Sequence, residues 1–337
     1  MSKREVVVLG VNGHIGRAVA EAFAATGWDV AGMARTDRHR LPGVRFVAGN
    51  SDSVEDMRRA IGEAPVVVNA LNLPYDQWDK GRMEAQMRRV IEALGSAGRT
   101  VLFPGNIYNF SADDRRVTPD LPQRPQPPRG AIRVRVEQMF ETAAARGDIQ
   151  AIILRAGDFY GPGSSNDWFD LAMFREVAKG RVATMGTPGI GHSWAYLPDL
   201  ARAFEALASM RATLGAVERF HFAGHFVTPE QMRAAIERAV PVPVTVRPFP
   251  LWIMKLLGLV DPVMRETGKM DYLWRRPMEL ADPRLDAVLV KGTVNGQCML
   301  QVGRDQPDKA APVIFKARLI PRPNVSADKD EAVRIAK

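Results

Sequence analysis

A glycine-rich turn near the N-terminus constrains the fold more than any other feature of the sequence. Three glycines spaced three residues apart follow the apolar run 5–9, and a helical pattern of apolar residues begins directly after them. A strand, a glycine turn and a helix in this order are typical of a dinucleotide-binding unit. The first glycine permits a tight turn, the second lets a pyrophosphate approach the backbone, and the third lets the helix pack on the strand. We therefore expect contacts with a dinucleotide from Gly10, Asn12, Gly13, His14, Ile15 and Gly16.

The first half of the chain alternates between apolar strand patterns and amphipathic helix patterns. Strands are expected at residues 5–9, 29–34, 44–48, 65–70, 100–103 and 150–155, with helices that include 54–61, 76–94 and 130–145 between them. This alternation predicts an α/β fold with a doubly wound parallel sheet, of the Rossmann type. Ligands of such sheets lie beyond the carboxyl ends of the strands, so we expect the backbone at Asn69, Ala70 and Leu71 to border the cofactor.

The pattern becomes looser after residue 163. Short helices are expected at 168–178, 198–208 and 229–239, and short strands at 219–222 and 242–247. We expect a Rossmann domain over residues 1–163 and a smaller substrate lobe over 164–287, part of which returns to the Rossmann core. The tail over 288–337 has scattered prolines and a charged end, which indicates an irregular or partly disordered segment.

Composition excludes several classes of protein. The 337-residue chain has one cysteine, Cys298, so it forms no internal disulfide, as is typical of a reducing cytosol. No secretory signal is visible, and the apolar segment 250–260 is too short to span a membrane, so we expect a cytoplasmic protein with a buried helix there. The net charge is +8, but the arginines are dispersed, which argues against nucleic-acid binding. His221 and His225 lie on a strand and the following turn, where their spacing makes no metal site.

The end of the second strand indicates which dinucleotide binds. An acidic residue there accepts hydrogen bonds from the adenosine ribose of NAD, whereas an arginine pairs with the 2′-phosphate of NADP. This chain has Arg35 at that place. The sequence therefore favours NADP(H) over NAD(H).

Three segments together resemble the short-chain dehydrogenase/reductase superfamily, in its extended or atypical branch of NAD-dependent epimerase/dehydratase-like proteins. The segments are the glycine turn 10–16, the sequence LRAGDFYGPG at 154–163, and the sequence WAYLPDLA at 194–201. The resemblance extends over about residues 4 to 285. It implies a Rossmann fold, a nicotinamide cofactor and an oxidoreductase or epimerase-like activity.

The chain departs from this family at the catalytic positions. Members that transfer a hydride use a Tyr-x-x-x-Lys pair, and an alignment of the helix through Glu137 puts Arg129 and Arg133 at those two positions. Arginine is always protonated near neutral pH, so Arg133 would contact the ribose or a phosphate without donating a proton. Nucleotide-sugar epimerases also tend to have an arginine where this chain has His192, which argues against a nucleotide-sugar substrate.

Other residues are therefore candidates for the chemistry. Tyr108 follows the fifth strand and is our first choice as proton donor, with Asn106 orienting a substrate carbonyl; the alternative is that Tyr108 packs under the proline-rich loop 118–128. Tyr160 and His192 are expected to lie beside the substrate. The alternative is that both have structural roles only.

Two functions follow from these residues. The first is an NAD(P)-dependent oxidoreductase or epimerase/dehydratase-like enzyme that acts on a small carbonyl or hydroxyl substrate. The alternative is an NADP(H)-binding sensor or regulatory protein without turnover, which the missing pair favours. The apolar stripe of helix 76–94 suits either a homodimer contact or burial within one chain; its residues are Met83, Met87, Val90, Ile91 and Leu94.

Overall fold

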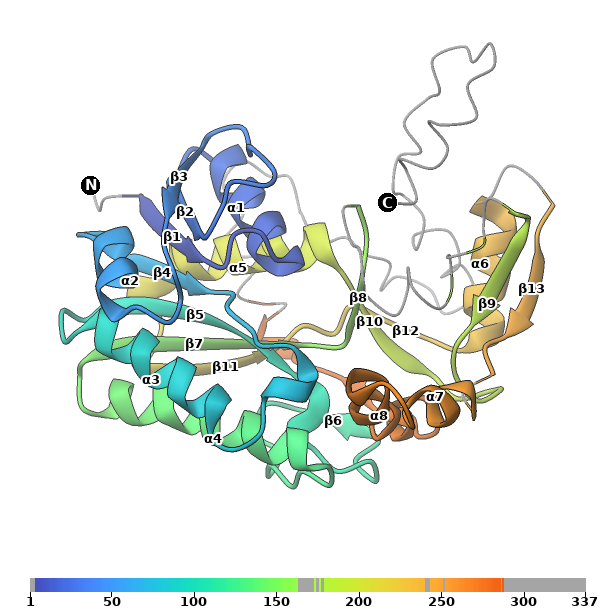
Figure 1. Ribbon diagram of the computed structural model, residues 1–337. Helices are drawn as coiled ribbons and strands as arrows, with labels where there is room; N and C mark the ends of the chain where they lie inside the picture. The colour runs from blue at the N-terminus through green and yellow to red at the C-terminus, as the bar shows by residue number, and fades with distance from the viewer. Residues whose placement is uncertain are drawn as a thin grey trace, which may run out of the picture.

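A seven-stranded parallel sheet organises the computed structural model, which describes residues 4–162, 173, 176, 179–239, 243–250, 252–285 and 287 (Figure 1). Its strand order is β11-β7-β5-β4-β1-β2-β3. The strands are β1 (Glu5–Leu9), β2 (Asp29–Ala34), β3 (Val44–Ala48), β4 (Val66–Asn69), β5 (Arg99–Asn106), β7 (Ile149–Ala156) and β11 (Val217–His221). The predicted doubly wound α/β fold is confirmed.

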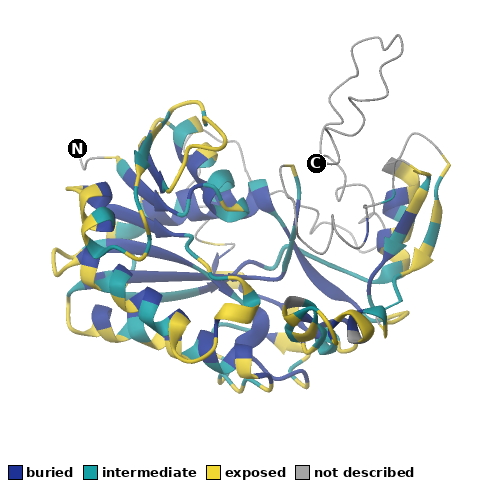
Figure 2. Ribbon diagram, viewed as in Figure 1, coloured by how far each residue is buried: buried dark blue, intermediate teal, exposed yellow. Residues whose placement is uncertain are grey.

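Helices cover both faces of this sheet because its central strands are apolar on both sides. Val6 and Val8 of β1 face α1 (His14–Ala25) and α5 (Leu197–Met210). Val7 and Leu9 face the opposite layer. The helices of that layer are α2 (Val54–Ile61), α3 (Arg82–Leu94) and α4 (Pro128–Ala145). Figure 2 shows the resulting buried centre between two layers of half-exposed helices.

The helix predicted over 76–94 is shorter than expected. A single 3-10 turn, η1 (Tyr75–Gln77), precedes the helix proper, which begins at Arg82. Gly81 separates the two with a φ of 72°, a left-handed conformation that interrupts a right-handed helix. The stripe that includes Met83 and Met87 is buried against the sheet of the same chain, so its apolar character needs no second subunit.

Three small sheets lie beyond the carboxyl edge of the large one. They consist of β8 (Asp158–Tyr160), β10 (His192–Tyr196) and β12 (His225–Val227); of β9 (Arg181–Thr184) and β13 (Thr245–Pro248); and of β6 (Arg116–Val117) and β14 (Glu279–Leu280). Helix α6 (Pro229–Ala239) packs beside β9, at the right of Figure 1. Of the predicted lobe elements, 198–208 is part of α5 beside the large sheet. The predicted strand 219–222 overlaps β11 within that sheet, and the predicted strand 242–247 overlaps β13, although its first residue lies outside the described ones. The predicted helix 168–178 lies almost wholly outside the described residues, and the tail 288–337 lies entirely outside them.

The apolar segment 250–260 was predicted as a buried helix, and this prediction is wrong. It forms the short helix α7 (Trp252–Leu257) and a turn that leads to α8 (Pro262–Gly268), with the 3-10 helix η6 (Asp271–Trp274) after them. Among its described residues only Met254 and Gly258 are buried, whereas Trp252 is 61% exposed and Leu259 is 79% exposed. The reason is that a six-residue helix can place only one face on a neighbour. None of the helices in the described ranges combines the length and apolarity that a membrane span requires.

Candidate functional site

The glycine turn has the geometry that a phosphate requires. Gly10 has a φ of +86°, and a Cβ on Gly16 would lie 2.2 Å from the Gly10 carbonyl oxygen, so neither position accepts a side chain. Gly13 differs, because a Cβ there would meet only the Gly10 oxygen at 3.4 Å. Helix α1 begins at His14, and its N-cap residue Gly13 has no side chain to cap it, which leaves the positive end of the helix dipole to an external anion. The turn therefore fits a dinucleotide.

The end of β2 lies against this turn. The Asn12 side chain donates a hydrogen bond of 2.7 Å from Nδ2 to the carbonyl oxygen of Thr36. Arg35, one residue earlier, is exposed, as are Arg38 and Arg40 in the loop that follows. This contact holds the start of the β2–β3 loop, which follows Arg35, against the glycine turn.

A pocket lies beyond the carboxyl ends of β4, β5 and β7. It brings together predicted residues from five separate segments, namely Ile15, Asn69, Ala70, Leu71, Asn106, Tyr108, Arg133 and His192. Tyr160 is not among its lining residues; its hydroxyl lies 3.0 Å from Nδ1 of His225. The pocket occupies the crevice expected for a ligand of a doubly wound sheet.

Two tyrosine hydroxyls meet at this pocket. The oxygens of Tyr75 and Tyr108 lie 2.7 Å apart, and both side chains line the pocket. The Asn106 side chain accepts a hydrogen bond from the Tyr108 backbone N–H at 3.0 Å, which begins the 3-10 turn η2 (Ile107–Asn109) and orients the ring. Burial raises the pKa of Tyr75 to about 12 and that of Tyr108 well above 10. Both hydroxyls are therefore protonated at neutral pH and act as hydrogen-bond donors.

An aspartate and a histidine form a second polar pair in the pocket. His192 on β10 has Nε2 at 2.8 Å from Oδ2 of Asp158 and Nδ1 at 3.0 Å from the carbonyl oxygen of Leu273. A carbonyl oxygen only accepts, so Nδ1 carries a proton. A proton on either the ring or the carboxyl group makes the contact between Nε2 and Oδ2 a hydrogen bond. The pair thus places two groups that can bind a proton in the same pocket as the two tyrosines.

The arginines at the expected tyrosine and lysine positions have different surroundings. Arg129 is buried outside the pocket lining and forms ion pairs with Asp79 at 3.1 Å and Glu266 at 3.0 Å. Arg133 lines the pocket, where its Nη2 donates a hydrogen bond to the Pro104 carbonyl oxygen. Of these two α4 arginines, Arg129 therefore forms ion pairs outside the pocket, and Arg133 lines the pocket.

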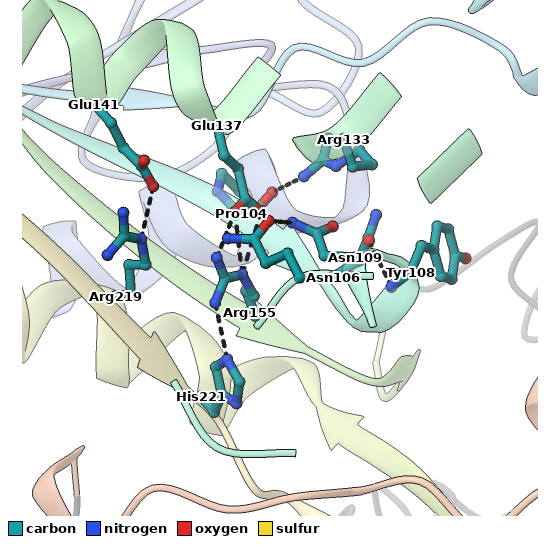
Figure 3. A network of polar contacts seen from close by, with 11 residues as sticks. Pro104, Asn106, Tyr108, Asn109, Arg133, Glu137, Glu141, Arg155, Arg219 and His221 are labelled. Atoms are coloured by element: carbon teal, nitrogen blue, oxygen red, sulfur yellow. Dashed lines mark hydrogen bonds and ion pairs between the residues drawn. The ribbon is translucent and has the colours of Figure 1, made fainter. Parts of the chain in front are cut away.

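A buried network of ion pairs and hydrogen bonds lies next to the pocket residues Pro104, Asn106 and Arg133 (Figure 3). Arg155 at the end of β7 donates to Glu137 of α4, with 2.6 Å between Nη2 and Oε2, and neither side chain is exposed. Nη1 of Arg155 donates to Nε2 of His221 at 3.0 Å. A Cβ on Gly105 would lie 2.4 Å from Cγ of Arg155, so a serine at this place would clash. This close contact explains why the fifth strand carries a glycine at position 105.

The sequence pattern indicated no site role for several residues that line the pocket, Tyr75 and Trp78 among them. Asp158 lies within the segment 154–163 that carries the family resemblance, but it was not proposed as a partner of His192. No local signal pairs Tyr75 with Tyr108 or Asp158 with His192, since each pair joins segments more than thirty residues apart. Among the described residues, no cluster of three or more histidine, cysteine, aspartate or glutamate side chains could hold a metal ion.

Comparisons with known proteins agree with this architecture. Residues 6–221 match the family described as NAD dependent epimerase/dehydratase. No curated protein sequence matches the chain significantly.

Solved structures show the same fold at low sequence identity. MoeE5 in complex with UDP-glucose and NAD is 19% identical, with a TM-score of 0.67 over 87% of this chain and 95% of that one. The UDP-glucose 4-epimerase of Thermus thermophilus in complex with NAD is also 19% identical, with a TM-score of 0.61 over 86% of this chain and 93% of that one. TunA, an NAD-dependent NDP-hexosamine 5,6-dehydratase, is 19% identical, with a TM-score of 0.60 over 73% of this chain and 84% of that one.

Proposed function

Because the chain belongs to the NAD dependent epimerase/dehydratase family, we propose that it is an enzyme that oxidises or reduces a hydroxyl or carbonyl group with a nicotinamide dinucleotide. The observation that carries this proposal is the pocket itself, where Ile15 of the glycine turn, the Tyr75–Tyr108 pair and the Asp158–His192 pair meet. A bound dinucleotide would supply or accept the hydride.

The residues of the chain have separate roles in this proposal. One tyrosine hydroxyl donates to the other, which leaves the second proton free for the substrate oxygen. The raised pKa values keep both groups neutral, so they position and polarise this oxygen. The Asp158–His192 pair takes up or returns the proton that accompanies the hydride. It thereby replaces the absent tyrosine and lysine.

We further propose NADP(H) as the preferred cofactor. Arg35 is exposed at the end of β2, where a guanidinium would pair with a 2′-phosphate. The similar structures of MoeE5 and of the Thermus epimerase contain NAD. The identity of the cofactor is therefore a sharp test of how far this chain departs from them.

The function is tested by titration of the purified protein with NADPH and NADH, followed by a substrate screen. The screen includes small carbonyl compounds, alcohols and UDP-glucose, and it monitors nicotinamide absorbance. Consumption that falls at least tenfold in Asp158→Asn, with dinucleotide affinity retained, supports the proposed roles. Tight binding without consumption by any compound favours the alternative, a sensor that binds the dinucleotide without turnover. Absence of binding would contradict both.

A further inference from the structure

Arg133 is a buried cation that lines the pocket without a carboxylate partner. Its side chain is 5% exposed, and its guanidinium lies 4.7 Å from the ring centre of Phe103 and 5.8 Å from that of Trp78. The Pro104 carbonyl oxygen accepts from Nη2, and Nε has no partner. Among the described residues, no aspartate or glutamate forms an ion pair with it.

The nearest acidic group on α4 already pairs with another arginine. Glu137 lies one turn after Arg133, but both of its carboxylate oxygens accept from Arg155. His221, on the other side of Arg155, is neutral at physiological pH because burial and the charge of Arg155 lower its pKa to about 3. The three groups Arg133, Glu137 and Arg155 therefore carry one net positive charge inside the protein.

The pocket does not compensate this charge from its other side. Asp158 already contacts His192, with 2.8 Å between Oδ2 and Nε2, and forms no ion pair with Arg133. Tyr75 and Tyr108 are protonated. A buried unpaired charge destabilises the folded state because it has lost its hydration, and a bound anion would remove this cost.

We propose that Arg133 is the anion-binding residue of the substrate site, so that the substrate carries a carboxylate or phosphate group beside the hydroxyl or carbonyl that reacts. This inference rests on the proposed function. A guanidinium binds both groups through paired hydrogen bonds. Ribose hydroxyls are neutral, so contact with the cofactor ribose alone would leave the charge uncompensated.

The test uses small anions and uncharged analogues of similar size. Pyruvate and methyl phosphate are each compared with pyruvamide at constant ionic strength, with and without saturating NADP⁺. Thermal unfolding and tryptophan fluorescence measure binding to wild type, Arg133→Met and Arg133→Lys. Arg135→Met is the matched control. It removes the same charge from the same helix, but the Arg135 side chain is 53% exposed.

We expect the wild type and Arg135→Met to bind at least one anion more than tenfold more tightly than pyruvamide. Arg133→Met should lose this preference, and Arg133→Lys should retain part of it. Which anion binds distinguishes a carboxylate from a phosphate substrate. Equal binding of pyruvamide and both anions to the wild type, or an unchanged preference in Arg133→Met, would overturn the inference.

The dinucleotide titration separates this inference from the proposed function. Arg133→Met should bind NADPH within about threefold of wild type. A large loss of NADPH affinity together with an unchanged anion preference would make Arg133 a cofactor residue and overturn the inference. Failure of the wild type to bind any dinucleotide would contradict the proposed function, whatever the anions do.

Discussion

Arg155 and Arg219 reach the same helix from neighbouring strands, but only one of them is fully buried. Arg155 pairs with Glu137, and both side chains are inaccessible to solvent, whereas Arg219 is 39% exposed beside Glu141. Loss of one partner from a buried pair leaves an unpaired charge, so Arg155→Met should lower the free energy of unfolding by about 3–5 kcal/mol. Arg219→Met should cost about 0–1 kcal/mol. Urea denaturation of the two variants checks this, and equal costs would show that burial does not determine the strength of these pairs.

His221 makes stability depend on pH in a defined direction. Folding lowers its pKa from 6.5 to about 3, so between these values the unfolded chain binds more protons than the folded one. Stability is therefore complete above pH 6.5 and decreases as the pH falls from 6.5 toward 3. This histidine alone should account for about 2 kcal/mol lost at pH 5.

The measurement is chemical denaturation between pH 7.5 and pH 5. His221→Gln should show a weaker pH dependence than wild type over this range, although its stability at pH 7.5 is lower. His39 is exposed in the β2–β3 loop, so His39→Gln is the control and should follow the wild-type profile. A His221→Gln profile parallel to wild type would contradict the assignment.

Single residues of the site were predictable only where a backbone constraint defines them. Gly10, Gly13 and Gly16 could be assigned because the turn geometry requires glycine. Tyr108 could be proposed from its place after a strand. Its partner Tyr75 could not, because their contact depends on how η1 and η2 meet in three dimensions.

At the scale of elements, substitutions in the β1–α1 unit should affect the free energy of unfolding and the affinity for NADPH differently. A Cβ on Gly13 meets only the Gly10 oxygen at 3.4 Å, whereas one on Gly16 would lie 2.2 Å from that oxygen. Gly13→Ala should therefore cost about 1 kcal/mol or less of stability but weaken NADPH binding at least tenfold, since the new methyl group faces the phosphate site. Gly16→Ala should cost about 1–3 kcal/mol because the helix must move away from the strand. Thermal unfolding and NADPH titration of both variants decide the matter; tight NADPH binding by Gly13→Ala would place the phosphates elsewhere.

Elements of the large sheet were predicted closely, and those of the smaller sheets were not. Strands such as β2 and β3 match their predicted bounds because apolar runs end at glycine or polar residues. The start of α3 was missed because periodicity continues through Gly81, where the backbone is left-handed. The segment of α7 was misjudged because apolar composition indicates burial only when a neighbouring element covers it, and coverage depends on tertiary structure.

At the scale of the whole molecule, the pocket joins the sheet to the part of the chain that follows it. Ile15, Asn69 and Tyr108 come from the large sheet and its loops, whereas His192 and Leu273 come from the later segments. The division of the chain at residue 163 remains a prediction, since α5 and β11 lie in the layers of the large sheet. A ligand in this pocket would contact both parts, so its binding should stabilise the entire molecule.

A ligand that binds only the folded protein raises its free energy of unfolding, so cofactor binding can be measured by thermal unfolding. A ligand that binds only the folded state at a concentration of one hundred times its Kd adds about 2.7 kcal/mol to the free energy of unfolding. We expect NADPH to raise the unfolding midpoint of the wild type, and NADH at equal concentration to raise it less. Arg35→Ala should reduce the NADPH effect to that of NADH and leave the NADH effect unchanged, because only NADPH carries the 2′-phosphate. Arg59→Ala is the control and removes the same charge. Arg59 lies on α2, is also exposed and pairs with Asp56. If Arg35→Ala weakened both dinucleotides equally, Arg35 would support the turn rather than select the cofactor, and the preference for NADP(H) would be wrong.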